Sequence, residues 1–158
     1  MRVSKQPFKK IEKRLAGKAA LRTDAATSAR MSRIRQTGTE PEMTVRRAAA
    51  TLGLRYTVNN KDLPGSPDLA NRSRRWAIFV HGCYWHRHEG CSKATTPGTN
   101  TEFWLNKFAW NVARDNAARE ALRRVGYQVL TFWQCELDSS SNVTGRLARL
   151  AARPHASK

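Results

Sequence analysis

Residues 79–91, FVHGCYWHRHEGC, concentrate side chains that can bind metal ions or transfer protons. Three of the chain's four histidines and two of its three cysteines fall in this stretch. Cys83, His88 and Cys91 offer two thiolates and an imidazole, and Cys135 can add a third thiolate if folding brings it near. A Cys3His set suits a tetrahedral zinc ion with no open position, which predicts a structural zinc site. The alternative is unrelated buried cysteines beside surface histidines.

His81 and His86 have no ligand role in that set. They lie around the start of the cysteine-bearing loop, at the carboxyl end of an apolar run, where polar side chains often converge on a functional site. Asp68 precedes Val80 by twelve residues, and a carboxylate on one strand beside a second strand is a common way to hold Mg²⁺ against a phosphate. A Pro-Asp dipeptide is also typical of an ordinary turn, and this alternative stays open.

The charge of the chain points to a polyanionic partner. Twenty-nine Lys and Arg face twelve Asp and Glu, which gives a formal charge of +17 and a pI near 11.0. Nucleic acid is the first candidate for such a partner. The sequence has no apolar run of roughly 18 residues and no secretory signal, so we expect a soluble cytoplasmic protein with no membrane association. Three cysteines cannot all pair, which favours reduced thiols over a disulfide framework.

The 158 residues, 40% of them hydrophobic, are enough for one domain with a single core. Residues 1–30 hold nine Lys or Arg and only two acidic residues. We therefore expect a basic N-terminal arm over 1–30, which is either partly helical after Pro7 or disordered, and a folded domain over 31–158. The other interpretations of the arm are a translation start assigned too far upstream and a transit peptide.

Hydrophobic periodicity and end signals predict the elements that must position these side chains. Helices are expected over 39–53, 101–126 and 142–153. Strands are expected over 54–58, 76–80 and 127–133, with a turn-rich segment before the second of them. The alternation of these helices and strands along the chain predicts an α/β fold with a mixed central sheet flanked by helices.

Five segments then occur in a recognisable order: MSRIRQTGTEPEMTVRRAAATLGLRY, KDLPGSPDL, AIFVHGCYWHRHEGC, TEFWLNKFAWNVARD and GYQVLTFWQCEL. Together, from about Met31 to Leu137, they resemble the very-short-patch repair endonucleases, the Vsr family. The resemblance implies a restriction-endonuclease-like fold with a structural zinc. It also implies a Mg²⁺-dependent enzyme that nicks double-stranded DNA on the 5′ side of the thymine in a T·G mismatch left by deamination of 5-methylcytosine. Such an enzyme is expected to be a bacterial, nucleoid-associated monomer, with other repair proteins as further candidate partners.

The resemblance also implies roles for single residues. Asp68 matches the family's metal-binding aspartate, and His81 and His86 match its two catalytic histidines. Glu42 matches a glutamate that supports the water shell of the metal, although it also stands where a capping-box glutamate belongs. At Val80 some relatives have threonine; the family's metal contact there is the main-chain carbonyl, which valine keeps. The spacing from His88 to Cys91 is one residue longer than in some relatives.

The aromatic residues Tyr84, Trp85 and Trp104 match side chains that enter the base stack beside the mismatch. Wedging rings into a base step costs a few kcal/mol, and a mispaired step opens more cheaply than a paired one. The alternative for these rings is ordinary core packing.

Two other classes of protein would also explain the charge. One is a non-catalytic, zinc-stabilised DNA-binding module, which would have no need for Asp68, His81 and His86 together. The other is a basic RNA-binding protein, for which we find no stacking-sheet motif. The sequence therefore favours the DNA endonuclease.

Overall fold

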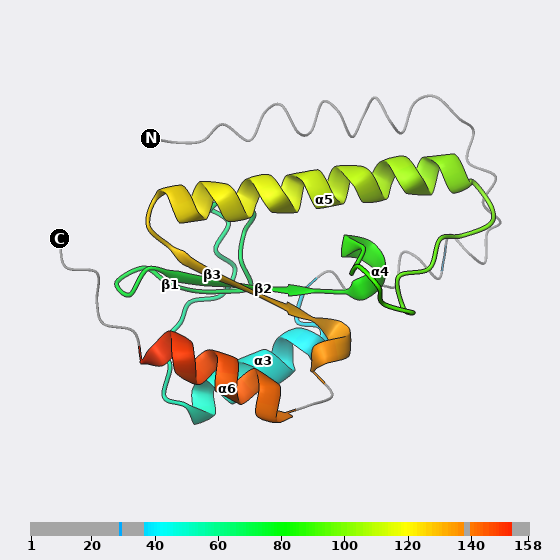
Figure 1. The fold of residues 1–158 in the computed structure, drawn as a ribbon. Coiled ribbons are helices and arrows are strands. Elements are labelled where there is room, and N and C mark those ends of the chain that lie inside the picture. The colour runs from blue at the N-terminus through cyan, green and yellow to red at the C-terminus, as the bar shows by residue number, and fades with distance from the viewer. Residues whose placement is uncertain (1–28, 30–36, 138–139, 153–158) are drawn as a thin grey trace.

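A three-stranded mixed sheet forms the centre of the fold (Figure 1). The structure, a computed structural model, describes residue 29 and residues 37–137 and 140–152, so nearly all of the expected basic arm lies outside the described residues. The strands are β1 (Leu69–Asn71), β2 (Trp76–His81) and β3 (Gln128–Trp133), in the spatial order β1-β2-β3. Strand β2 pairs antiparallel with β1 and parallel with β3, which confirms the predicted mixed sheet.

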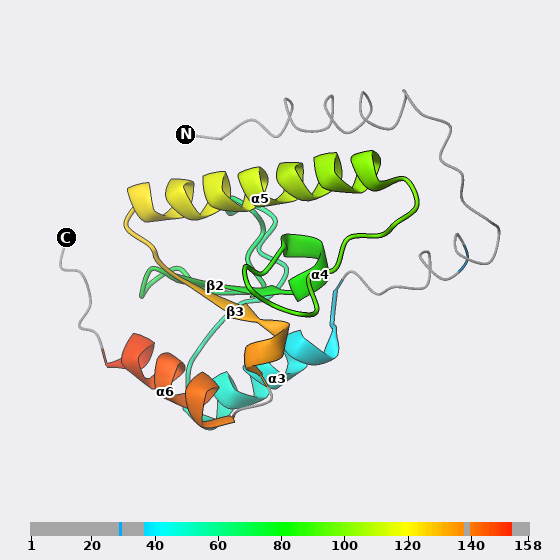
Figure 2. The same cartoon turned by 45° about the vertical axis from the view of Figure 1, so that its right-hand side comes forward.

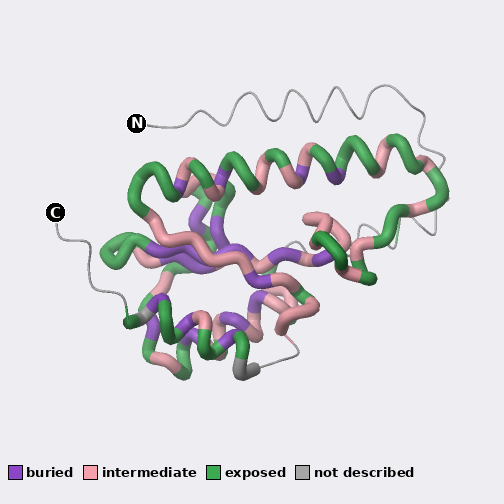
Figure 3. Tube along the Cα trace, in the orientation of Figure 1, coloured by how far each residue is buried: buried purple, intermediate pink, exposed green. Residues whose placement is uncertain are grey.

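Helices cover both faces of this sheet. Helices α3 (Glu40–Thr51) and α6 (Ser140–Ala151) lie together on one face, and the long helix α5 (Thr101–Arg124) lies across the other (Figures 1 and 2). Because successive side chains of a strand point to opposite faces, β2 serves two cores. Its Trp76 and Ile78 pack toward α3 and α6, whereas Ala77 and Phe79 pack toward α5. Burial on both faces explains why β2 reads as a continuous apolar run, and Figure 3 shows the buried residues gathered on the sheet.

The long predicted elements are confirmed. Helix α3 starts after Thr39, whose backbone N–H and hydroxyl both donate to Glu42, and it ends before Gly53 at φ +66°. Helix α5 ends one residue before Val125, and Gly126 at φ +84° turns the chain into β3. The expected strands at 76–80 and 127–133 and the C-terminal helix are also present.

The predicted strand over 54–58 is wrong. Only Thr57 forms a bridge there, to Ala70 of β1, through two backbone hydrogen bonds. The chain then turns at Asn59, where φ is +55°, and the buried Asn60 side chain donates to the carbonyls of Thr57 and Pro67. These local hydrogen bonds take the place of a strand ladder. Three further elements were not predicted, namely β1, the one-turn helix α4 (Cys83–His86) and the 3-10 helix η1 (Gln134–Glu136).

The turn-rich segment before β1 is held against α5 at one close contact. Gly65 has φ +73°, and a Cβ built there would lie 2.5 Å from the Cβ of Ala118 on α5. Only glycine fits this approach and this backbone conformation. The contact fixes the loop that delivers Asp68 to the start of β1. No helix in the described part of the chain is long and apolar enough to cross a membrane.

Candidate active site and metal cluster

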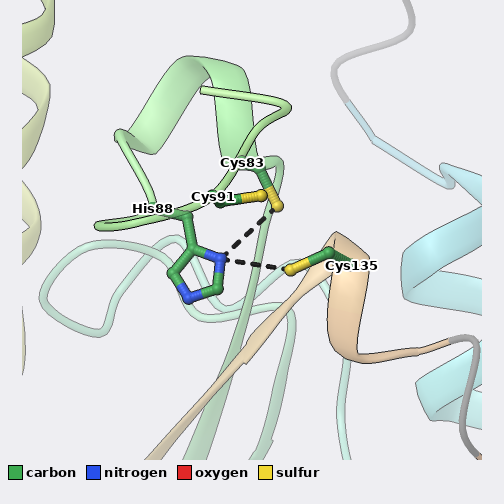
Figure 4. A group of neighbouring side chains, drawn as sticks. All are labelled: Cys83, His88, Cys91 and Cys135. Atoms are coloured by element: carbon green, nitrogen blue, oxygen red, sulfur yellow. Dashed lines mark hydrogen bonds between the residues drawn. The ribbon is translucent and has the colours of Figure 1, made fainter. Parts of the chain in front are cut away.

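Four potential metal ligands meet beyond the carboxyl ends of β2 and β3 (Figure 4). Cys83 begins α4, His88 and Cys91 follow in the next loop, and Cys135 lies in the 3-10 helix η1 (Gln134–Glu136). Their ligand atoms all lie within 4.8 Å of one another, and Nδ1 of His88 is 3.1 Å from Sγ of Cys135. Folding thus brings Cys135 to the other three, and the three cysteines are free thiols. The cluster can hold one metal ion.

The local backbone explains how nine residues supply three of these ligands. Helix α4 ends after one turn because Arg87 adopts the left-handed conformation, at φ +55°. The N–H of His88 then donates back to the carbonyl of Cys83, and the N–H of Cys91 donates to the carbonyl of His88. These two bonds fold the loop onto itself with all three side chains on the same side.

The thiols of this cluster influence one another. A backbone N–H at Lys93 lowers the pKa of Cys91, whereas desolvation and the neighbouring Cys83 and Cys91 sulfurs raise the pKa of Cys135 to about 12. Three thiolates at this separation repel one another unless a cation lies between them. Three sulfur donors and one imidazole are the set that a soft or borderline divalent ion prefers.

A second cluster, made of His81, His86 and Asp115, lies next to the first. The two imidazole rings stack with their centroids 4.0 Å apart, and Nδ1 of His86 is 2.5 Å from Oδ2 of Asp115. Burial is the main cause that lowers the pKa of His81 to about 3, and the neighbouring His86 adds to it. Burial, the largest single cause, would raise the pKa of Asp115, but the hydrogen bond with His86 and the charges of His86, His81 and Arg114 together outweigh it and lower that pKa. His81 is therefore neutral near pH 7, and Asp115 is a carboxylate.

Sequence reasoning missed Asp115. It lies on α5, on the same stripe as the buried residues Phe108, Asn111, Ala118 and Leu122. The spacings of seven, four, three and seven residues from these positions put its side chain on the sheet-facing side of the helix. A carboxylate within an otherwise inward-facing stripe was the signal that could have identified it.

Asp68 directly precedes β1, which lies on the opposite edge of β2 from β3. The N–H of Val80 donates to Oδ2 of Asp68 at 2.7 Å. Burial is the largest cause that raises the pKa of Asp68 to about 6; the Val80 hydrogen bond opposes it, and the nearby Glu42 carboxylate adds to it. Glu42 is buried, and its carboxylate accepts a hydrogen bond from the N–H of Gly38 at 2.9 Å and forms an ion pair with Arg46 at 3.2 Å. The structure therefore shows its capping role.

Strand register places the Val80 carbonyl near Asp68. The carbonyl of Ile78 accepts the N–H of Asp68 at 2.9 Å, so it points toward β1. Residues two apart in a strand direct their backbone groups to the same edge, so the carbonyl of Val80 points that way as well. Because β1 begins at Leu69, opposite Ile78, the pairing has ended before Val80. The carboxylate and the carbonyl thus face the same space.

A hollow of about 430 Å³ opens on the α5 side of the histidines. Its lining includes His81, His86 and Asp115, with Trp133 at the end of β3 and the cationic Arg119 of α5. Asp68 is not among the lining residues of this hollow. The hollow is thus lined by imidazoles, by the guanidiniums of Arg87 and Arg119 and by the carboxylates of Glu89 and Asp115, which suits a polar substrate.

The aromatic residues singled out in the sequence form one half-buried group. Tyr84 and Trp85 of α4 have ring centroids 4.9 Å apart, and Trp104 of α5 lies 6.0 Å from Trp85 and 6.2 Å from Tyr84. The ammonium of Lys107 lies 5.7 Å from the Trp85 ring and 5.4 Å from the Trp104 ring. The rings therefore pack on one another between α4 and α5, next to a cation, and none of them is fully buried.

The sequence is similar to one family of DNA endonucleases and to several nicking enzymes. The family described as DNA mismatch endonuclease Vsr matches residues 19–93. A type II nicking enzyme of Xanthomonas oryzae, V.XorIIP, is 39% identical over 120 residues, which cover 76% of this chain and 88% of that enzyme. The type II nicking enzyme V.NmeAIP of Neisseria meningitidis is 36% identical over 132 residues, covering 81% and 94%. The DNA mismatch endonuclease Vsr of Escherichia coli is 41% identical over 92 residues, 58% of each chain.

Proposed function

We propose, from the premise that the chain belongs to the Vsr family of DNA mismatch endonucleases, that it nicks one strand of a duplex on the 5′ side of the thymine in a T·G mismatch. Such mismatches arise when 5-methylcytosine deaminates. Membership makes the chain a DNA endonuclease and therefore a hydrolase. The observation that best supports catalysis is the His81–His86–Asp115 cluster beside Asp68, because a DNA-binding module has no need for it.

We assign a catalytic Mg²⁺ to Asp68 and the main-chain carbonyl of Val80, with Glu42 near its water shell. Oxygen donors from a carboxylate and a carbonyl suit Mg²⁺. Burial raises the pKa of Asp68 because it disfavours the charged carboxylate, and a bound cation would stabilise that charge. When bound, the ion would polarise the scissile phosphate and stabilise the leaving oxygen. The fold implied by this function is the restriction-endonuclease-like one.

The two histidines take different roles in this proposal. His81 is neutral because it is buried, so it can accept a hydrogen bond from the attacking water and thereby orient or activate it. His86 directs Nδ1 at the Asp115 carboxylate, which fixes the orientation of the ring and leaves Nε2 to stabilise the leaving oxygen. The two rings stack at 4.0 Å, and of the two it is His86 that is hydrogen-bonded to the Asp115 carboxylate.

We propose that the metal held by Cys83, His88, Cys91 and Cys135 is a structural zinc. The four side chains complete a tetrahedral set and leave no position for substrate. The ion would join the loop after α4 to η1, two segments that the chain separates by more than forty residues. The catalytic His81 and His86 would be held in place by the same loop.

The aromatic group is the proposed means of mismatch recognition. Tyr84, Trp85 and Trp104 present rings that can insert beside the mispaired step, and Lys107 stands next to them for phosphate contact. The basic arm over 1–30 would add affinity for the DNA backbone without reading bases. We further propose a monomer that acts on DNA in the cytoplasm of a bacterial cell, with other repair proteins as candidate partners.

The test is a nicking assay with purified protein and Mg²⁺. Duplexes that carry one T·G mismatch, with randomised flanking positions to cover unknown sequence contexts, are compared with fully paired duplexes on a denaturing gel. We expect single-strand cleavage 5′ to the mismatched thymine and intact paired DNA. Mismatch binding without cleavage would favour the non-catalytic module, and equal cleavage of both pools would contradict the proposed specificity.

A further inference from the structure

Strand β3 lies at the edge of the sheet, so one row of its backbone groups has no strand partner among the described residues. Unpaired groups on an edge strand leave its position weakly determined unless other residues satisfy them. Near the carboxyl end of β3 the outward-facing groups are the carbonyl of Thr131 and the N–H of Trp133, because Gln128, of opposite parity, bonds toward β2. Both of these groups are satisfied by side chains.

Arg146 of α6 and Glu136 of η1 supply those bonds. Arg146 donates to the carbonyl of Thr131 at 2.6 Å and to Oε2 of Glu136 at 2.9 Å. The same Oε2 accepts the N–H of Trp133 at 3.1 Å. The guanidinium of Arg146 also lies 4.4 Å from the centroid of the Phe132 ring. We call the Arg146–Glu136 pair the β3 clasp.

The clasp holds a segment that reaches both functional clusters. Cys135, the metal ligand contributed by η1, lies between Trp133, whose N–H donates to the clasp, and Glu136, which belongs to the clasp. The Trp133 ring stacks on His88 with centroids 4.3 Å apart at 10°, and it meets His81 edge-on at 5.3 Å. A shift of the end of β3 would therefore displace one metal ligand directly and press on another, and it would also remove the contact that supports His81.

We propose that Arg146 and Glu136 are positioning residues, which fix Cys135 for metal binding and orient the Trp133 ring between His88 and His81. The inference rests on the proposed metal-binding role of the cysteine cluster. It gives α6, which lies outside the segments that carry the family resemblance, a part in the functional site. Helix α6 is anchored for this purpose by Val143, Leu147 and Leu150, which are buried in the core.

A role in positioning explains the geometry better than a role in global stability. Both clasp side chains are 29% exposed, and ion pairs that remain in contact with water contribute little to stability. Charge-assisted hydrogen bonds are nevertheless short and directional, which suits them to fixing a backbone. Residues that orient metal ligands typically change metal affinity by about 10–100-fold when replaced.

The test compares Arg146→Ala and Glu136→Gln with two control variants of the full chain. Arg149→Ala removes an exposed arginine from the same helix, and Leu150→Ala weakens the core contact of α6 without touching the clasp. Zinc affinity is measured by competition with a chromophoric chelator, thiolate ligation by the absorption spectrum of the Co²⁺-substituted protein, and folding by thermal melting. Nicking of the T·G duplex is followed separately as kcat and KM.

We expect Arg146→Ala to weaken zinc binding about tenfold or more, to reduce thiolate-to-Co²⁺ absorption, and to lower kcat with little change in KM. Glu136→Gln keeps an acceptor for Trp133 and should fall between Arg146→Ala and wild type. Arg149→Ala should match wild type. The proposal is overturned if Arg146→Ala binds zinc as wild type does, or if Leu150→Ala loses as much affinity at an equal drop in melting temperature. If the wild-type protein binds no metal, the zinc assignment and the positioning role of the clasp are both wrong. The nicking assay tests the proposed function independently of that result.

Discussion

The two clusters at the end of the sheet are neighbours in space but are held together by different forces. His81 and His86 belong to one and Cys83 and His88 to the other, so their residues alternate along a single short stretch. The cysteine cluster has three sulfurs that repel one another when all are thiolates, and a bound cation would relieve this repulsion. The histidine cluster is already satisfied by ring stacking and a carboxylate. We therefore expect loss of a thiol to affect the fold, and loss of an imidazole or carboxylate to affect the chemistry.

The largest effect is expected on the chemical side of this comparison. Asp68→Ala and His81→Ala should each lower the single-turnover nicking rate by about 10²–10⁴-fold, because metal binding and proton transfer each contribute on that scale. Zinc content and mismatch binding should stay close to wild type. The exposed Glu120→Ala on α5 serves as a control for charge removal. A wild-type rate in Asp68→Ala would show that the magnesium site lies elsewhere.

Cys135→Ala should have the opposite profile. Removal of the η1 ligand is expected to abolish stoichiometric zinc and to cost several kcal/mol of folding free energy, because a structural metal site contributes to folding directly. Metal analysis and denaturant unfolding of the same preparation provide the measurement. Well-folded wild-type protein that lacks zinc, or a Cys135→Ala variant as stable as wild type, would remove the contrast between the two clusters.

The pH dependence of stability should separate Asp68 from the cysteine cluster. The pKa of Asp68 in the folded protein is about 6, above its ordinary value of 3.8. The contribution of Asp68 to folding stability is therefore complete below about pH 4 and is lost as the pH rises through 6. Asp68→Asn should therefore gain on wild type between pH 4 and 7, by at most about 3 kcal/mol. Thermal melting across this range measures the gain, and Mg²⁺ should stabilise the wild type alone. A difference that shrinks with rising pH would reverse the assignment.

The aromatic group should show the smallest effect, and one confined to the mismatch. Trp85→Ala or Trp104→Ala should cost about 1–3 kcal/mol of binding to T·G duplex and less on paired DNA, with little change in salt dependence. Leu105→Ala provides a matched control, because Leu105 is 51% exposed on the same helix. If both duplexes lose affinity equally and the melting temperature collapses, as expected for a buried ring, the group is core and does not act as a wedge.

The sequence predicted best those features that depend on long local patterns. Strands β2 and β3 are sustained apolar runs and helix α5 is a long helical pattern. The four residues of the cysteine cluster are recognisable by type, although only folding shows that Cys135 lies beside the other three. The strand expected at 54–58 failed because Asn60 offers the backbone hydrogen bonds that compete with a ladder. Strand β1 was not predicted because a strand of three residues between turns is too short to show a hydrophobic periodicity.

Asp115 illustrates a different limit. Its importance arises only when α5 crosses the end of β2 and brings the carboxylate within 2.5 Å of His86, a contact between residues 29 apart in the chain. Local pattern can mark it as a charged residue on a buried stripe but cannot name its partner. The β3 clasp is similar, because Arg146 reads as one of several arginines of a basic helix until the edge of the sheet is placed beside it.

The most direct test of the separation between the two clusters is single-turnover nicking of a T·G duplex by wild type and Asp115→Asn, at equal zinc content and saturating Mg²⁺. The substitution keeps the shape of the side chain and removes the charge that supports His86. We predict a rate about 10²-fold lower, with unchanged zinc content and unchanged affinity for the mismatch. A wild-type rate, or a loss of zinc from Asp115→Asn, would contradict the assignment of chemistry to one cluster and structure to the other.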